Sequence, residues 1–116
     1  MNYDLTQFLS GHGGYRSYLY RFKLDSSPRC PECPNEDETA EHVVFKCPRF
    51  NNIRREIEAF IGETLSVTNV ITVMLQSESY WNALNHYISN VHNTLQMAER
   101  SRKAEMAALS LVMTQN

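Results

Sequence analysis

The sequence predicts a mostly α-helical fold with a long helix near the C-terminus. The residues that break helices are concentrated in two loops, since three of the four glycines lie within residues 11–14 and three of the four prolines within 28–34. Hydrophobic residues make up 42% of the 116 residues and charged residues 21%, which is typical of a globular protein rather than a disordered one. Elsewhere, apolar residues recur with helical spacing.

Two short helices are expected before the proline-rich loop. The first spans residues 4–10 and ends at Gly11. The second spans Tyr15 to Lys23, and four residues at helical spacing are predicted to form its buried stripe: Tyr15, Tyr18, Leu19 and Phe22.

Residues 25–38 are rich in turn formers, and helices resume after them. Thr39 is predicted to cap a short helix that runs through Phe45. Pro48 suits the first turn of the next helix, which ends at Gly62. Its apolar face is predicted to contain Phe50, Ile53, Ile57 and Phe60.

The C-terminal half is predicted to contain a short helix and a long one. Val70, Ile71, Met74 and Leu75 indicate the short helix, and Ser77 is expected to cap the long one. We therefore divide the chain into residues 1–62, a helical pair with a metal-binding loop, and residues 63–116, a helical region with a frayed tail from residue 104.

The long helix carries an apolar seam with heptad spacing: Trp81, Leu84, Ile88, Val91, Leu95 and Ala98. Three heptads are marginal for an autonomous coiled coil. Two interpretations remain open: the seam packs on the chain's own helices, or residues 81–98 form a homodimer or bind a partner helix.

Charge and hydropathy exclude some functions. The formal net charge is −2 and the pI is near 6.1, so the chain is not a polycation that binds nucleic acid through net charge. No apolar run is long enough to span a membrane. Residues 1–10 lack the pattern of a secretory signal. We expect an intracellular protein, nuclear or cytoplasmic, with no membrane partner and no small-molecule substrate.

The three cysteines and one histidine give the strongest chemical signal. Cys30, Cys33, His42 and Cys47 follow the spacing C-x2-C-x8-H-x4-C. An odd number of cysteines within 18 residues argues against a disulfide framework. Three thiolates and an imidazole favour zinc, and four such ligands complete a tetrahedral site. We therefore predict one structural zinc ion in a zinc knuckle.

Two other interpretations of these residues remain open. The cysteines could be free and buried beside a solvent-exposed histidine, or a Cys/His pair could be redox-active or nucleophilic. A cysteine hydrolase is disfavoured because the metal would use all three thiols. His12, His86 and His92 are expected to be surface or half-buried polar groups.

Local basic residues suggest contact with nucleic acid. The chain has more arginines than lysines, and several lie beside aromatic residues, as in single-strand binders. The candidates for binding RNA or DNA are Arg16, Tyr20, Arg29, Lys46, Arg49 and Arg55. The alternative is a solvated surface of mixed charge, in which Arg54 pairs with Glu58 along one helix. The acidic residues between Cys33 and His42 would repel phosphate from that side of the knuckle.

Several segments resemble one family, the Pol polyproteins of arthropod non-LTR retrotransposons, and most closely its ribosomal-DNA-inserting and Jockey-like groups. Residues 5–15 and 18–22 resemble the segment that precedes the zinc knuckle in that family. Residues 30–33, 38–45 and 47–50 resemble its C-terminal CCHC motif. Three later segments resemble the region that comes after this motif in the family: 69–75, 77–79 and 81–83.

The resemblance implies the C-terminus of a longer polyprotein with an endonuclease and a reverse transcriptase. It also implies that Cys30, Cys33, His42 and Cys47 bind the metal. For the region as a whole, it implies a role in binding template RNA or target DNA during target-primed reverse transcription. The chain itself shows no polymerase motif, because its three aspartates are never adjacent. We expect no enzymatic activity from it. The alternative is a non-catalytic, zinc-stabilised interaction or dimerisation module derived from a retroelement.

Overall fold

The structure is a computed structural model that describes residues 3–114. It contains five α-helices: α1 (Tyr3–Ser10), α2 (Arg16–Arg21), α3 (Asn51–Ile61), α4 (Val70–Gln76) and α5 (Glu78–Thr114). A π-helical turn, η1 (His42–Lys46), and a 3-10 turn, η2 (Pro48–Phe50), precede α3. Within residues 3–114 no strand forms beyond one isolated antiparallel bridge between Arg29 and Asp37. The prediction of a mostly helical fold with a long C-terminal helix is confirmed.

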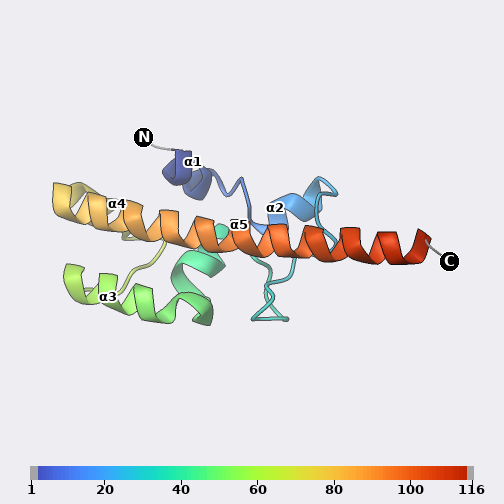
Figure 1. Ribbon diagram of the computed structural model, residues 1–116. Helices are drawn as coiled ribbons and strands as arrows, with labels where there is room; N and C mark the ends of the chain where they lie inside the picture. Colours follow the sequence, from blue (N-terminus) through green and yellow to red (C-terminus); the bar gives the residue numbers. More distant parts are fainter. Residues whose placement is uncertain (1–2, 115–116) are drawn as a thin grey trace.

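Helix α5 is the axis on which the other elements are arranged. It is 37 residues long, and the molecule measures 60 × 25 × 19 Å. Helices α1, α3 and α4 contact α5, and Figure 1 shows them along its first half. The loop after α2 reaches α5 farther along, where Asp25 bonds Arg102. The last turns of α5 project beyond the other elements (Figure 1).

The apolar seam of α5 is covered by the chain itself. Leu84, Ile88, Val91 and Leu95 are all buried in a core cluster that also contains Leu5 and Phe8 of α1, together with residues of α3 and α4. One core therefore draws on both residues 1–62 and residues 63–116. Self-association through residues 81–98 would require these helices to separate, and it stays a prediction.

Two predicted apolar faces differ from the observed ones. In and beside α2, Tyr15 and Leu19 are buried as expected, but Phe22 is 54% exposed, because α2 ends at Arg21 and the chain turns away. In α3, the predicted Phe60 is 54% exposed, and the neighbouring Ile61 is buried in its place. In α4 the buried residues are Val70, Val73 and Met74, and Ile71 and Leu75 face outward.

The predicted helix boundaries are largely confirmed by local hydrogen bonds. The hydroxyl of Thr39 accepts from the His42 amide at 3.1 Å, and that of Ser77 accepts from the Tyr80 amide at 3.0 Å. Gly62 ends α3 with a φ of 80°, a left-handed conformation that favours glycine.

Helix α5 continues through the segment that was predicted to fray, as far as Thr114. Its exposed apolar residues there are Met106, Leu109, Leu111 and Val112. No helix among residues 3–114 combines the length and apolar character needed to cross a bilayer.

Candidate metal centre

The first half of the site is a tight loop with Cys30 at its start and Cys33 within it. The Cys30 amide donates to the Glu36 carbonyl at 2.8 Å, and the Glu36 amide donates to the Cys33 carbonyl at 2.9 Å. The bridge between Arg29 and Asp37 closes the base of this loop. Backbone hydrogen bonds therefore hold both thiols on one side of the loop.

The second half is the π-helical turn η1, which carries His42 and leads into Cys47. In a regular α-helix, residues five apart point about 140° away from each other. Here the Cys47 amide donates to the His42 carbonyl at 2.7 Å, which is the i to i+5 bond of a π turn. Cys47 itself leaves the helix with extended backbone angles. The wider π turn and the extended backbone at Cys47 together bring the His42 imidazole and the Cys47 thiol to the same side of the turn.

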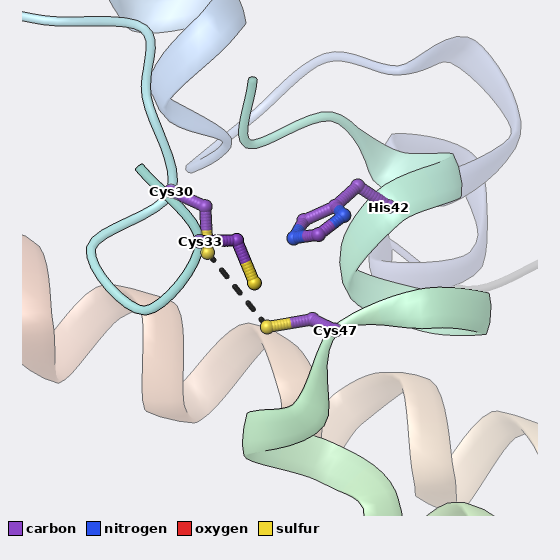
Figure 2. A group of neighbouring side chains, drawn as sticks. All are labelled: Cys30, Cys33, His42 and Cys47. Atoms are coloured by element: carbon purple, nitrogen blue, oxygen red, sulfur yellow. Dashed lines mark hydrogen bonds between the residues drawn. The ribbon is translucent and has the colours of Figure 1, made fainter. Parts of the chain in front are cut away.

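The four side chains converge on one point, as Figure 2 shows. One ligand atom from each of Cys30, Cys33, His42 and Cys47 lies within 4.8 Å of all the others. The Cys30 and Cys47 sulfurs are 3.7 Å apart. A tetrahedral site with metal–sulfur bonds of about 2.3 Å requires sulfurs about 3.8 Å apart. The cluster therefore has the dimensions of a metal site.

The protonation chemistry of the cluster also fits a metal ion. His42 Nε2 is buried and has no hydrogen-bond partner among the described residues, so a metal would satisfy an otherwise orphaned lone pair. Burial lowers the pKa of His42, which favours the neutral imidazole that ligates metals. Burial and the neighbouring sulfurs of Cys30 and Cys47 raise the pKa of the Cys33 thiol to about 11, because a further negative charge beside them is unfavourable without a cation.

Arg49 joins the cluster to a buried carboxylate. Its guanidinium lies 3.3 Å from the Cys47 sulfur and 3.4 Å from the Cys30 sulfur, and it donates to Glu38 at 2.9 Å. Burial alone lowers the pKa of Arg49, but the Cys47 sulfur and Glu38 outweigh it, so the net shift is upward. Arg49 therefore places a positive charge beside the thiolates that a metal would bind.

Glu38 is 1% exposed. It links α2 to the metal loop, which is the loop of residues 29–37 that carries Cys30 and Cys33. Besides Arg49, its carboxylate accepts from the Arg16 amide at 3.1 Å, and its carbonyl accepts from the Ser17 amide at 3.2 Å. The start of α2 is therefore held against the metal loop through one residue.

Arg54 is the second buried cation beside the site. It donates to three carbonyls of the η1 region, those of Val43, Val44 and Cys47, at 3.2, 3.0 and 2.8 Å. These acceptors lie at the C-terminal end of a helical turn, where carbonyls lack intrahelical partners. The expected pairing of Arg54 with Glu58 is not what the structure shows, since Glu58 instead accepts from the Leu65 amide.

The candidate nucleic-acid residues differ widely in what they can reach. Arg16 is buried in an ion pair with Asp25 at 2.8 Å, and Arg49 is directed at Glu38 and the sulfurs. Their guanidiniums are thus engaged inside the protein. The other four are exposed: Tyr20, Arg29, Lys46 and Arg55. Of these, Arg29 pairs with Asp37 and Lys46 pairs with Glu41.

His92 is half-buried, as expected, and its ring bridges α1 and Tyr15, the residue before α2. Its Nε2 lies 2.6 Å from the Tyr15 hydroxyl and its Nδ1 lies 2.9 Å from an Asp4 carboxylate oxygen. Ser89 donates to the other Asp4 oxygen at 2.9 Å. The residues lie up to 88 positions apart, so no local pattern could have indicated the contact.

Comparison with known proteins gives one informative similarity. The chain is 33% identical over 69 residues to the "Retrovirus-related Pol polyprotein from type-1 retrotransposable element R1" of Popillia japonica. The match covers 58% of this chain and 28% of that relative, so the chain corresponds to a small part of it. No protein-family model matches the chain, and no solved structure matches it. The similarity supports a retrotransposon origin for a chain that carries a Cys3His cluster able to hold a metal ion.

Proposed function

We propose that Cys30, Cys33, His42 and Cys47 bind one structural zinc ion, and that the chain is the zinc-knuckle region of a non-LTR retrotransposon Pol polyprotein. The observation that carries the proposal is the convergence of three thiols and one imidazole within 4.8 Å. Soft sulfur ligands with an imidazole favour zinc over magnesium or calcium. Four protein ligands leave no open position for a reactive water, which favours a structural role over a catalytic one.

Within such a polyprotein, the proposed role is to help bind template RNA or target DNA during target-primed reverse transcription. The similarity to an R1 Pol polyprotein supports this role, as do the exposed cations of the chain. Zinc would contribute by ordering the loop of residues 25–38, which contains few apolar side chains, and by tying it to the η1 turn. In this proposal the chain contributes binding surface, and catalysis belongs to other parts of the polyprotein.

The test is the metal content of the purified chain, measured by elemental mass spectrometry for wild type, His42→Ala and His86→Ala. His86 lies exposed on α5 and serves as the matched control. We expect about one zinc per chain in wild type and His86→Ala, and a large loss in His42→Ala. A folded wild-type protein that contains no zinc and takes none up would refute the metal assignment.

A second candidate function is a protein-interaction module, and the exposed apolar end of α5 favours it. Met106, Leu109, Leu111 and Val112 lie on turns that project beyond the other helices. Sedimentation of wild type against Leu109→Asp tests for self-association. A substitution in the buried seam, such as Leu84→Asp, would unfold the core instead. A monomer at all concentrations in both proteins would exclude a homodimer through this end.

A further inference from the structure

A surface pocket lies where residues 23–26, just after α2, meet α5, and none of the four cluster residues lines it. It has a volume of about 370 Å³. Lys23, Leu24 and Ser26 line it from the loop, and Arg102 and Lys103 line it from α5. Lys23 has a φ of 60°, a left-handed conformation that turns the chain back toward α5 after the helix ends.

The charge in and around this pocket is positive. Asp25 is held between two cations, Arg16 at 2.8 Å and Arg102 at 2.9 Å. Glu99 pairs with Lys103 at 2.8 Å. Lys23 makes no ion pair within residues 3–114, and the buried Nε of Arg102 has no acceptor there. Four cationic side chains therefore surround two carboxylates, although the whole chain carries a net charge of −2.

Exposed aromatic residues come just before the pocket residue Lys23 in the chain. Tyr20 is 49% exposed and Phe22 is 54% exposed, in the residues directly before Lys23. The Arg21 guanidinium lies over the Phe22 ring, 5.5 Å from its centre, and the Tyr18 and Phe22 ring centres are 4.9 Å apart, so Arg21 and these rings form one cation–aromatic group. Cations that neutralise phosphates, combined with rings on which bases stack, are the parts of a single-strand binding surface.

The other polar pocket, beside the metal loop, is less suited to an anion. It is lined by Glu36, Asp37 and Glu41 together with Arg29 and Lys46, and both cations are paired with carboxylates. A zinc ion held by three thiolates would add a further net negative charge. Electrostatics therefore favours the pocket between the α2 loop and α5 for a phosphate.

We propose that the pocket formed by Lys23, Arg102 and Lys103 binds a backbone phosphate of single-stranded nucleic acid, while the adjacent Tyr20 and Phe22 rings stack on its bases. The inference rests on the proposed nucleic-acid role and gives that role a different location. Only Tyr20 is shared with the residues that the sequence suggested.

The test is fluorescence anisotropy of a labelled ten-nucleotide oligo(U) RNA, titrated with the zinc-loaded full chain over a range of salt concentrations. The variants are Lys23→Gln with Lys103→Gln, and Lys46→Gln as the matched control on the metal-loop pocket. Zinc content and circular dichroism verify that each variant is folded. Tyr20→Ala tests the stacking.

We expect the Lys23/Lys103 double variant to bind about tenfold more weakly, with a salt slope lower by about 0.7, since the pocket holds one phosphate and each phosphate contact in a single strand contributes about 0.7. Lys46→Gln should bind like wild type. Loss of binding in Lys46→Gln with no change in the double variant would overturn the pocket and leave the nucleic-acid role standing. Absence of RNA binding by zinc-loaded wild type would overturn both.

Two competitors separate the possible sources of the anion. A polyglutamate peptide that displaces the RNA at equal charge would show a general polyanion surface and overturn the assignment to nucleic acid. If inorganic phosphate binds at millimolar concentration while the RNA does not bind at all, the pocket is a free-phosphate site, and the assignment to nucleic acid is overturned as well. We expect neither competitor to displace the RNA until its negative charge exceeds that of the RNA by about tenfold.

Discussion

The carboxylate of Glu38 lies 2.9 Å from the Arg49 guanidinium, and the same guanidinium contacts the sulfurs of Cys30 and Cys47. The carboxylate is 1% exposed, so the pair is largely removed from water. Metal ligands in proteins are commonly oriented by hydrogen-bonded groups behind them. Glu38 therefore acts on the metal cluster through Arg49, without touching a ligand itself.

Glu38→Gln is expected to lower the free energy of unfolding by about 3 kcal/mol, because removing one partner of a buried ion pair leaves the other charge uncompensated. The matched control is Glu41→Gln, whose exposed pair with Lys46 at 3.6 Å should contribute less than about 1 kcal/mol. Urea unfolding of the zinc-loaded proteins at pH 7 measures both. Equal effects of the two substitutions would contradict the proposed importance of the buried pair.

Arg54→Met is expected to lower the unfolding free energy by about 3 kcal/mol, because it leaves buried carbonyls of the η1 region without a donor. It should also weaken metal binding by about 10–100-fold, as loss of a supporting contact behind a ligand does. The neighbouring Arg55 is exposed, so Arg55→Met should change neither quantity. Competition with a chromogenic zinc chelator gives the affinity, and an unchanged affinity in Arg54→Met would contradict the supporting role.

Removing the metal is expected to lower the melting temperature by at least about 10 °C. Zinc at 100 times its dissociation constant stabilises the folded state by about 2.7 kcal/mol, and each 1 kcal/mol shifts the melting temperature of a domain this size by about 4–8 °C. Thermal unfolding with zinc and with excess chelator measures the shift. His42→Ala should melt at the same temperature under both conditions, and a shift as large as that of wild type would count against the site.

Tyr15 makes stability depend on pH in the alkaline range. Burial, with the charges of Asp4 and Glu38, raises the pKa of Tyr15 far above its usual value of about 10. The folded state thus holds the proton that the unfolded state releases. The stability that this contributes is fully present below pH about 10 and is lost as the pH rises from there through the raised pKa.

The difference in unfolding free energy between wild type and Tyr15→Phe should therefore be constant from pH 7 to 9. Above pH 10 it should shrink by up to about 1.4 kcal/mol per pH unit. Urea unfolding across this range measures it, with the exposed Tyr20→Phe as the control. A constant difference up to pH 11.5 would contradict the assignment.

Gly13 and Gly14 are adjacent but differ in what they tolerate. Gly13 has a φ of 98°, and a Cβ there would lie 2.7 Å from the Gln7 side chain, whereas a Cβ on Gly14 would have no neighbour within 4 Å. Gly13→Ala should cost about 1–3 kcal/mol of stability through backbone strain. Gly14→Ala should be neutral or slightly stabilising. Thermal melts distinguish them, and equal melting temperatures would refute the difference.

The features of the fold that local patterns encode were predictable. Glycine and proline placement gives most of the helix boundaries, and the capping residues Thr39 and Ser77 lie where their side chains suggested. The predicted faces of α2 and α3 were wrong at Phe22 and Phe60, because helical spacing near a helix end does not decide which side chain is buried. Tertiary contacts decide it, as they do for Ile61, which is buried beside the exposed Phe60.

The convergence of Cys30, Cys33, His42 and Cys47 was predictable from spacing and residue type, whereas the residues that support this cluster were not. Arg49, Arg54 and Glu38 appear in the sequence as ordinary charged residues, which are usually exposed. The π turn that orients His42 has no sequence signature. Arg16 and Arg49 were assigned to nucleic acid from their residue type and their position near aromatic residues, and only the three-dimensional structure shows their internal partners.

The long range of the contacts to His92 has a consequence for the order of events during synthesis. The four cluster residues lie within 18 positions, so they can come together once that short segment has left the ribosome. Tyr15 and His92 are separated by 77 positions, and α1 gains its contacts with α5 only after α5 has been made. At about 5–20 residues per second, the interval between the two steps lasts seconds. If the four residues bind zinc as proposed, they would therefore meet the metal ion before the core that surrounds them is complete.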